Sequence, residues 1–196
     1  YSITTALGMA YEGAKSQTAS EIQTLFGFPT DSTARQSAFA TLHKHLNPQK
    51  AGYQLSIANS FWAQQGFDFL PEYTDVLREH YSAEATNVDF AGETEATRLR
   101  INKWVSDKTA ERIPELFEPG MLTPDTRLAL VNAIYFKGKW AEQFDPERTQ
   151  EREFRAPDGK VMAPTMWHKA DFEYGEDENV QVIALPYADS ELEMLV

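Results

Sequence analysis

The fold is decided by the stretch Asn132-Ala133-Ile134-Tyr135-Phe136-Lys137-Gly138-Lys139-Trp140 and by the apolar residues that lead into it. Residues 127–138 have the composition of a strand, and successive strand residues point to opposite faces of a sheet. Both of these faces are apolar here, which predicts a central strand that is covered on both sides. Asn132 is the one strongly polar residue on its face, which it shares with Leu128, Leu130, Ile134 and Phe136.

A second asparagine lies in an equivalent position. Residues 53–62 alternate as a strand does, and Asn59 shares a face with Leu55, Ile57 and Phe61. A buried amide without a partner costs about 1–3 kcal/mol, so both asparagines are predicted to have hydrogen-bond partners. Ser2, at the start of the first predicted helix, is a candidate. Two interpretations remain open: polar groups satisfied inside an ordinary core, or a polar cluster beneath a sheet that has to open.

Helical periodicity precedes and separates these strands. The first helix is predicted to carry one apolar stripe, formed by Ile3, Ala6, Leu7, Ala10 and Ala14. The next helix is predicted to begin with a capping box from Thr18 to Glu21 and to stop at Gly27. A third helix is predicted over 32–46, with Phe39, Leu42 and Leu46 inward and Asn47-Pro48 at its end.

Two further helices are predicted, one beginning at Pro71 and one covering 93–109. The remaining pattern predicts a short strand over 85–90, two strands around the turn Pro157-Asp158-Gly159, and a hairpin of 180–187 with 191–196 joined around Asp189-Ser190. Helices followed mostly by strands indicate an α+β fold, with helices packed on large, mostly antiparallel sheets.

Composition excludes several classes of protein. Of the 196 residues 42% are apolar, enough for a core, and no apolar run is long enough to cross a membrane. The formal net charge of -12 argues against a nucleic-acid or anionic-membrane partner. The chain has no cysteine, which excludes disulfides and thiol chemistry. Because it begins and ends inside predicted elements, we expect a segment of a longer protein whose signal-peptide region is out of view.

The segment Asn132–Trp140 resembles the motif that serpins carry on the third strand of their main sheet. Five other segments resemble serpin motifs in the same order, so that the resemblance extends over the whole chain: Tyr1–Ala14, Thr18–Ile22, Ala58–Trp62, Ile101–Val105 and Leu185–Leu195. One departure is Ala110-Glu111-Arg112, which replaces the Gly-Lys-type pair usual after the helix that crosses the main sheet.

The resemblance implies that residues 1–196 are part of a single serpin domain: helix-rich 1–50, main-sheet strands and crossing helix 51–140, and second- and third-sheet strands 141–196. It implies a suicide inhibitor of a serine-type, or alternatively a cysteine-type, protease, whose reactive loop inserts into the main sheet. Ser2, Asn59 and Asn132 would form the shutter beneath that sheet, and Trp140 would lie at the breach where the loop enters. The reactive bond lies outside this chain. The expected protein is an extracellular monomer, with an intracellular location as the alternative.

Other functions find less support in the residues. No nucleophile elbow, zinc-protease motif or phosphate-binding loop is present, and the sequence predicts no catalytic residue, cofactor or metal. His43 and His45 point to different helix faces, and His80 and His168 lack ligand-like neighbours. A non-inhibitory serpin with a carrier, chaperone or storage role remains an alternative. Activation by a glycosaminoglycan would need a basic stripe, for which the region near 32–46 offers only Arg35, Lys44 and Lys50.

Overall fold

The structure is a computed structural model that describes residues 1–46, 53–188 and 191–196. Contacts between residues divide the chain into two units. The first comprises the described parts of 1–49 and 55–136, and the second comprises those of 50–54 and 137–196. The two units are described separately below.

The first unit contains a three-stranded sheet in the order β2 (Ala83–Val88), β1 (Tyr53–Gln64), β3 (Leu128–Gly138). Strands β1 and β2 are parallel, in a register that pairs Asn59 with Ala83. On the other side of β1, the Gln64 amide donates to the Arg127 carbonyl at 2.9 Å, so the end of β1 meets the start of β3. The five residues from Asn59 to Ala63 are all buried, because β1 is covered on both faces.

Strand β3 was predicted to be central, but among the described strands it is an edge and β1 is central. One face of β3 is buried through Ala129, Val131 and Ala133, whereas the other face is only half-buried. Apolar faces report how well a strand is covered, and say little about whether both of its edges are paired.

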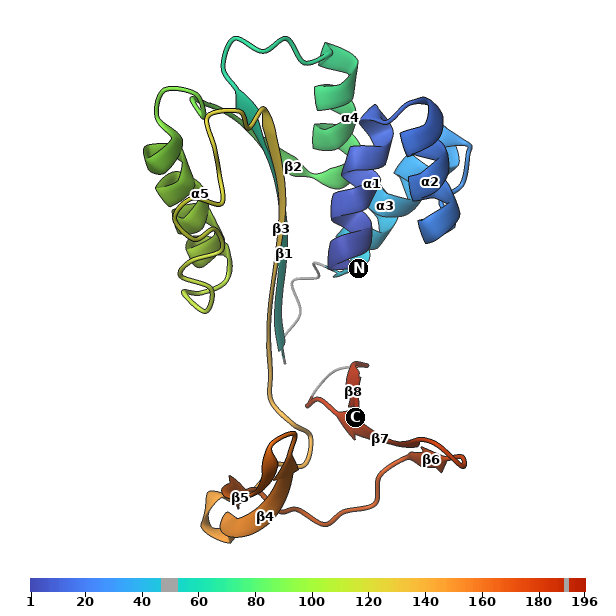
Figure 1. Cartoon of the computed structure of the whole chain (residues 1–196). Coiled ribbons are helices and arrows are strands. Elements are labelled where there is room, and N and C mark those ends of the chain that lie inside the picture. The colour runs from blue at the N-terminus through green and yellow to red at the C-terminus, as the bar shows by residue number, and fades with distance from the viewer. Residues whose placement is uncertain (47–52, 189–190) are drawn as a thin grey trace. The chain divides into compact units, whose positions relative to one another are not determined.

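Helices cover both faces of this sheet (Figure 1). The helices α1 (Ser2–Gly13), α2 (Ser16–Phe26), α3 (Ser32–Leu46) and α4 (Pro71–Tyr81) lie on one face, and α5 (Thr94–Lys108) lies on the other. The first layer encloses a core that includes Met9, Phe39, Phe61, Leu77 and Tyr81. The second encloses Trp62, Phe90, Ile101, Val105 and Val131.

Helix α1 buries a different face from the predicted apolar stripe. Its buried residues are Thr5, Gly8 and Met9, whereas Ile3 is 71% exposed. A Cβ atom on Gly8 would lie 2.8 Å from Phe39 and 3.1 Å from Tyr81, so the glycine permits the close approach of α1 to α3 and α4. Close helix contact at Gly8 therefore places Thr5 and Gly8 beside Met9 on the most buried face, whereas Ala6, Leu7, Ala10 and Ala14 of the predicted stripe are half-buried.

The predicted capping box at Thr18 is wrong. Helix α2 begins at Ser16, and the Ala19 amide already donates to the Lys15 carbonyl, so Thr18 lies inside the helix. Glu21 instead accepts a hydrogen bond from the side chain of Gln17, four residues earlier, at 2.7 Å. The predicted stop is confirmed, because Gly27 adopts the left-handed conformation with φ of 66°.

The remaining helices agree closely with the prediction. Helix α3 has the predicted bounds and buries Phe39, although Leu42 is 44% exposed, and the predicted stop Asn47-Pro48 lies outside the described residues. Pro71 is the first residue of α4, where its missing amide hydrogen is tolerated. Strand β2 and helix α5 lie within two residues of their predicted bounds.

The second unit is built from short strands and one turn of 3-10 helix at Pro146–Arg148. Strands β4 (Gln150–Ala156) and β5 (Gly159–Thr165) form a hairpin at the predicted turn, with Ala156 opposite Gly159. Strands β6 (Tyr174–Glu176), β7 (Gln181–Pro186) and β8 (Glu193–Leu195) form a second antiparallel sheet. The predicted pairing of the last two is confirmed, and Asp189-Ser190 lie outside the described residues. In the described part of the chain, no helix is long and apolar enough to cross a membrane.

Candidate functional site

A chain of hydrogen bonds connects the three polar residues that the sequence singled out. The Ser2 hydroxyl on α1 donates to Asn132 Oδ1 on β3. Asn132 Nδ2 donates to Asn59 Oδ1 on the neighbouring strand at 2.7 Å, and Asn59 Nδ2 donates to the Tyr81 carbonyl at 2.6 Å. The predicted partners of both asparagines are thus confirmed, and they tie two strands to α1 and α4.

The end of helix α4 supplies the last acceptor of this chain. Tyr81 is the final residue of α4, and Ser82 follows it in the left-handed conformation. Carbonyl groups in the last turn of a helix have no partner within the helix, so the Tyr81 carbonyl is available to Asn59. Asn59 and Tyr81 are each only 1% exposed. Since all three bonds run in the same donor-to-acceptor direction, they reinforce one another in this low-dielectric site.

The side chain of Tyr81 connects this chain to a second polar cluster, which sequence reasoning missed. The Tyr81 hydroxyl donates to Glu12 Oε1 on α1 at 2.8 Å. Glu12 also accepts from Arg35 on α3 through two bonds of 2.8 and 3.0 Å, and from Gln36 at 3.0 Å. The side chains of Arg35 and Glu12 are 7% and 5% exposed, so the ion pair is buried.

The protonation of this cluster is strongly biased by its surroundings. Burial raises the pKa of Glu12, but hydrogen bonds from Arg35, Gln36 and Tyr81 outweigh burial and hold the pKa below its ordinary value. Burial, reinforced by the negative charge of Glu12, raises the pKa of Tyr73 to about 12 and that of Tyr81 further still. At neutral pH Glu12 is therefore a carboxylate and both tyrosines keep their hydroxyl hydrogens.

Arg35 was considered in the sequence as part of a basic stripe for a glycosaminoglycan, and the structure contradicts that. Its guanidinium is turned inward to Glu12 and to the Pro29 carbonyl at 2.7 Å, and it lies 4.5 Å from the centre of the Tyr11 ring. Lys50 lies outside the described residues. A sequence signal for the cluster exists, because Thr5, Gly8 and Glu12 follow helical spacing on the buried face of α1.

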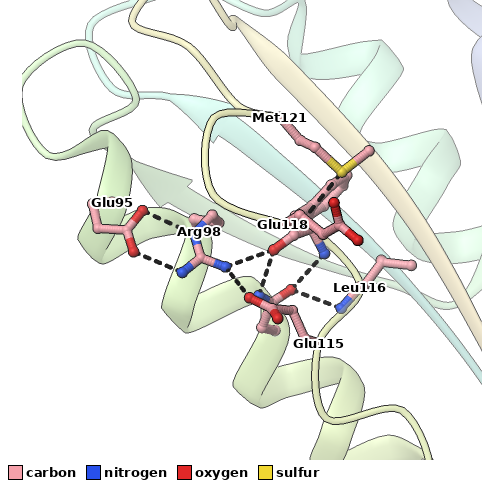
Figure 2. A network of polar contacts seen from close by, with 8 residues as sticks. Glu95, Arg98, Glu115, Leu116, Glu118 and Met121 are labelled. Atoms are coloured by element: carbon pink, nitrogen blue, oxygen red, sulfur yellow. Dashed lines mark hydrogen bonds and ion pairs between the residues drawn. The ribbon is translucent and has the colours of Figure 1, made fainter.

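On the opposite face of the sheet, α5 is fastened to the loop that follows it (Figure 2). Arg98 makes a forked ion pair with Glu95 and a second pair with Glu115 at 2.6 Å, and it donates to the Phe117 carbonyl. Asn102 completes the attachment by donating to the same carbonyl and accepting from the amides of Leu116 and Phe117. The side chain of Arg98 is 6% exposed, whereas its partners Glu95 and Glu115 are 63% and 49% exposed.

The predicted departure after the crossing helix has a structural counterpart. Ala110 and Glu111, which follow α5, have φ angles of 49° and 60°. This left-handed region suits glycine and strains a residue with a Cβ atom. Residues with a Cβ atom at 110 and 111 therefore add local strain where glycine would be tolerated.

Trp140 belongs to the second unit. It forms an isolated antiparallel bridge with Tyr187, and the two rings stack at 4.6 Å with an interplanar angle of 12°. The Ala141 amide donates to the Pro186 carbonyl, and the Ala188 amide donates to the Lys139 carbonyl. Trp140 is therefore held by backbone and ring contacts to the end of β7 and the residues that follow it.

In the part of the chain that the structure describes, no three potential metal ligands gather. His168 lies between the rings of Phe144 and Phe172, with Nε2 at 3.9 Å from a Glu142 oxygen. His43 lies near the Tyr1 hydroxyl at 3.4 Å.

The protein has an α+β fold in which hydrogen bonds join helices α1 and α4 to strands of the sheet. Residues 1–196 match the family described as Serpin (serine protease inhibitor). The chain is 36% identical over 197 residues to an uncharacterized serpin-like protein of Methanosarcina mazei, in an alignment that covers 100% of this chain and 46% of that protein. It is 38% identical over 199 residues to the leukocyte elastase inhibitor of Bos taurus, covering 100% and 52%.

Solved structures agree with these relatives. Emu ovalbumin superposes with a TM-score of 0.92 at 27% identity, over 100% of this chain and 55% of that one. A cleaved serpin, Serpin 42Da, superposes with a TM-score of 0.89 at 31% identity, over 99% and 52%. The chain belongs to the serpin family, and it spans about half the length of the relatives it matches.

Proposed function

We propose that this chain is part of a suicide inhibitor of serine-type proteases, with cysteine-type proteases as the alternative target. The chain contains the residues that control the opening of the inhibitor's main sheet. In this mechanism the protease cleaves a reactive loop outside this chain, and its serine hydroxyl becomes esterified to the loop while the new amine leaves. The loop then adds as a strand to the sheet before water hydrolyses the ester. Family membership supports this proposal, and relatives that are named as inhibitors support it further.

The sheet is the site at which the proposed mechanism adds a strand. Among the described strands it has the order β2, β1, β3. A strand that adds to a sheet gains a row of main-chain hydrogen bonds.

The observation that carries the proposal is the hydrogen-bond chain from Ser2 through Asn132 and Asn59 to Tyr81. Closely packed apolar side chains separate only at the cost of cavities. Hydrogen-bonded side chains can exchange partners, so a polar cluster allows strands to separate and re-form without leaving groups unpaired. Ser2, Asn59 and Asn132 are therefore assigned to the shutter.

The other assignments follow from the same mechanism. Trp140 is assigned to the breach where the loop enters, and α5 must shift to let the new strand pass. None of these residues is catalytic, and the mechanism needs no cofactor. The proposed partner is a protease bound by an extracellular monomer.

The test uses the full-length protein and a panel of serine and cysteine proteases. Denaturing gels are expected to show a covalent complex with at least one protease, and cleavage of the loop is expected to raise the melting temperature. A protein that gives no complex with any protease and no gain in thermal stability on cleavage would instead have a carrier, chaperone or storage role.

A further inference from the structure

Tyr81 belongs to both polar clusters of the first unit. Its backbone carbonyl accepts the hydrogen bond from Asn59, and its hydroxyl donates to Glu12. The two ends of one residue thus join the cluster beneath the sheet to the ion pair between α1 and α3. Tyr81 is 1% exposed, so no water competes for either contact.

The ion pair fixes where Tyr81 lies. Glu12 is held by both nitrogens of the Arg35 fork and by Gln36, so the oxygen that Tyr81 contacts has a defined position. The Tyr81 ring also packs against Phe39 at 4.7 Å and lies against Gly8. Because Tyr81 is the last residue of α4, its ring contacts position the end of that helix and with it the carbonyl that Asn59 uses.

We propose that Glu12 and Arg35 are positioning residues for the shutter, which act on Asn59 through Tyr81. The shutter role of Asn59 rests on the proposed function, whereas the link from Glu12 to Asn59 rests only on the contacts described above. Losing the Tyr81 hydroxyl loosens the end of α4, and Asn59 then releases its carbonyl partner more often. The ion pair thereby sets how firmly β1 and β3 are held.

Helix α4 offers a matched control. Tyr73 lies on the same helix, and its hydroxyl donates to the Met9 carbonyl on α1 at 3.1 Å. Tyr73→Phe therefore removes one tyrosine hydroxyl from the same α1–α4 contact, and among the described residues that hydroxyl bonds to Met9 and not to a group that contacts Asn59. Tyr81→Phe keeps the backbone carbonyl and the ring, and removes only the contact with Glu12.

The experiment measures hydrogen exchange of the Asn59 side-chain amide by NMR in the full-length protein labelled at asparagine. Tyr81→Phe and Glu12→Gln are each expected to speed this exchange by about tenfold, the factor that corresponds to losing about one hydrogen bond. Tyr73→Phe is expected to leave it within about twofold. In the double variant Glu12→Gln with Tyr81→Phe, exchange is expected to match the Tyr81→Phe value, because one path carries both effects.

Equal exchange in Tyr81→Phe and Tyr73→Phe would overturn the inference, and so would effects of Glu12→Gln and Tyr81→Phe that multiply. If Glu12→Gln does not fold, the comparison of the two tyrosine variants still tests whether the Tyr81 hydroxyl controls the exchange of the Asn59 amide. The readout does not involve a protease, so absence of a covalent complex would count against the proposed function without affecting this result.

Discussion

Asn132 on β3 donates its side-chain amide to Asn59 on β1 at 2.7 Å, so that two neighbouring strands are joined by a side-chain bond as well as by their backbones. Each asparagine has a further partner on a helix, Ser2 in one case and the Tyr81 carbonyl in the other. Removing either amide therefore leaves two partners without a hydrogen bond.

Asn132→Ala is expected to lower the free energy of unfolding by about 1–3 kcal/mol, because Asn59 Oδ1 and the Ser2 hydroxyl lose their partner in a partly buried site. If the cluster is a shutter, the variant of the full-length protein is also expected to lose monomer faster on warming. Size-exclusion chromatography after timed incubation measures this loss. An unchanged monomer lifetime would contradict the assigned role, even if stability falls.

Asn102→Ala is expected to loosen the loop after α5. The change removes an acceptor for the amides of Leu116 and Phe117 and a donor to the Phe117 carbonyl, and about 1–3 kcal/mol is expected from such a loss. Hydrogen exchange of the Leu116 and Phe117 amides measures the effect. Lys103→Ala, which removes an exposed pair with Asp107, is the control and should change stability by less than about 1 kcal/mol. Slow exchange at both amides in Asn102→Ala would refute the prediction.

Ala110→Gly is expected to stabilise the protein. Ala110 has a φ of 49°, and left-handed backbone costs a residue with a Cβ atom about 1–2 kcal/mol that glycine avoids. Part of the gain is offset because glycine has more freedom in the unfolded chain, so a net increase of about 0.5–1 kcal/mol is expected in urea unfolding. A lower free energy of unfolding for Ala110→Gly would contradict this prediction. It would show that the Ala110 methyl group makes contacts that compensate for the strain.

Acid is expected to weaken the Glu12–Arg35 contact. The pKa of Glu12 in the folded protein lies below its ordinary value of 4.5, so its contribution to stability is complete above that value and is lost as the pH falls through the folded-state pKa. The groups that face Glu12 are Arg35, Gln36 and Tyr81 through hydrogen bonds, and Tyr73 through its charge.

Glu12→Gln cannot lose this contribution on acidification. Its free energy of unfolding is therefore expected to fall less steeply than that of the parent protein between about pH 6 and pH 3. Asp75→Asn, which removes a carboxylate from an exposed pair with Arg78, is the matched control and should follow the parent curve. Parallel curves for Glu12→Gln and the parent protein would rule out the assigned contribution.

The asparagine cluster could be predicted because strand alternation placed two amides on apolar faces, where only hydrogen bonding makes them tolerable. The partner of Asn132 was predicted as Ser2, whereas the Tyr81 carbonyl could not be, since a backbone acceptor has no signature in the sequence. The bounds of α3 were predicted because hydrophobic period and punctuation coincide there.

The Glu12–Arg35 pair was missed for a related reason. The buried face of α1 carries Thr5 and Gly8 beside Met9, and Gly8 allows the helices to approach closely. The apolar periodicity followed other residues of the helix and gave no signal for Glu12. Arg35 lies on a helix whose other charged residue, Lys44, is exposed, and only the three-dimensional packing of α1 against α3 shows the partner of Arg35. Ion pairs between elements distant in sequence depend on such packing.

Two attachments of α5 differ in the kind of contact that makes them. In the middle of the helix, Asn102 is joined to the following loop by three hydrogen bonds between uncharged groups. Near the end of the helix, Lys108 and Trp104 contact Glu84 on β2, which is 53% exposed. Salt screens an exposed ion pair far more than hydrogen bonds between uncharged groups. We therefore expect higher ionic strength to weaken the contact of the C-terminal end of α5 with β2 while the Asn102 attachment to the loop persists.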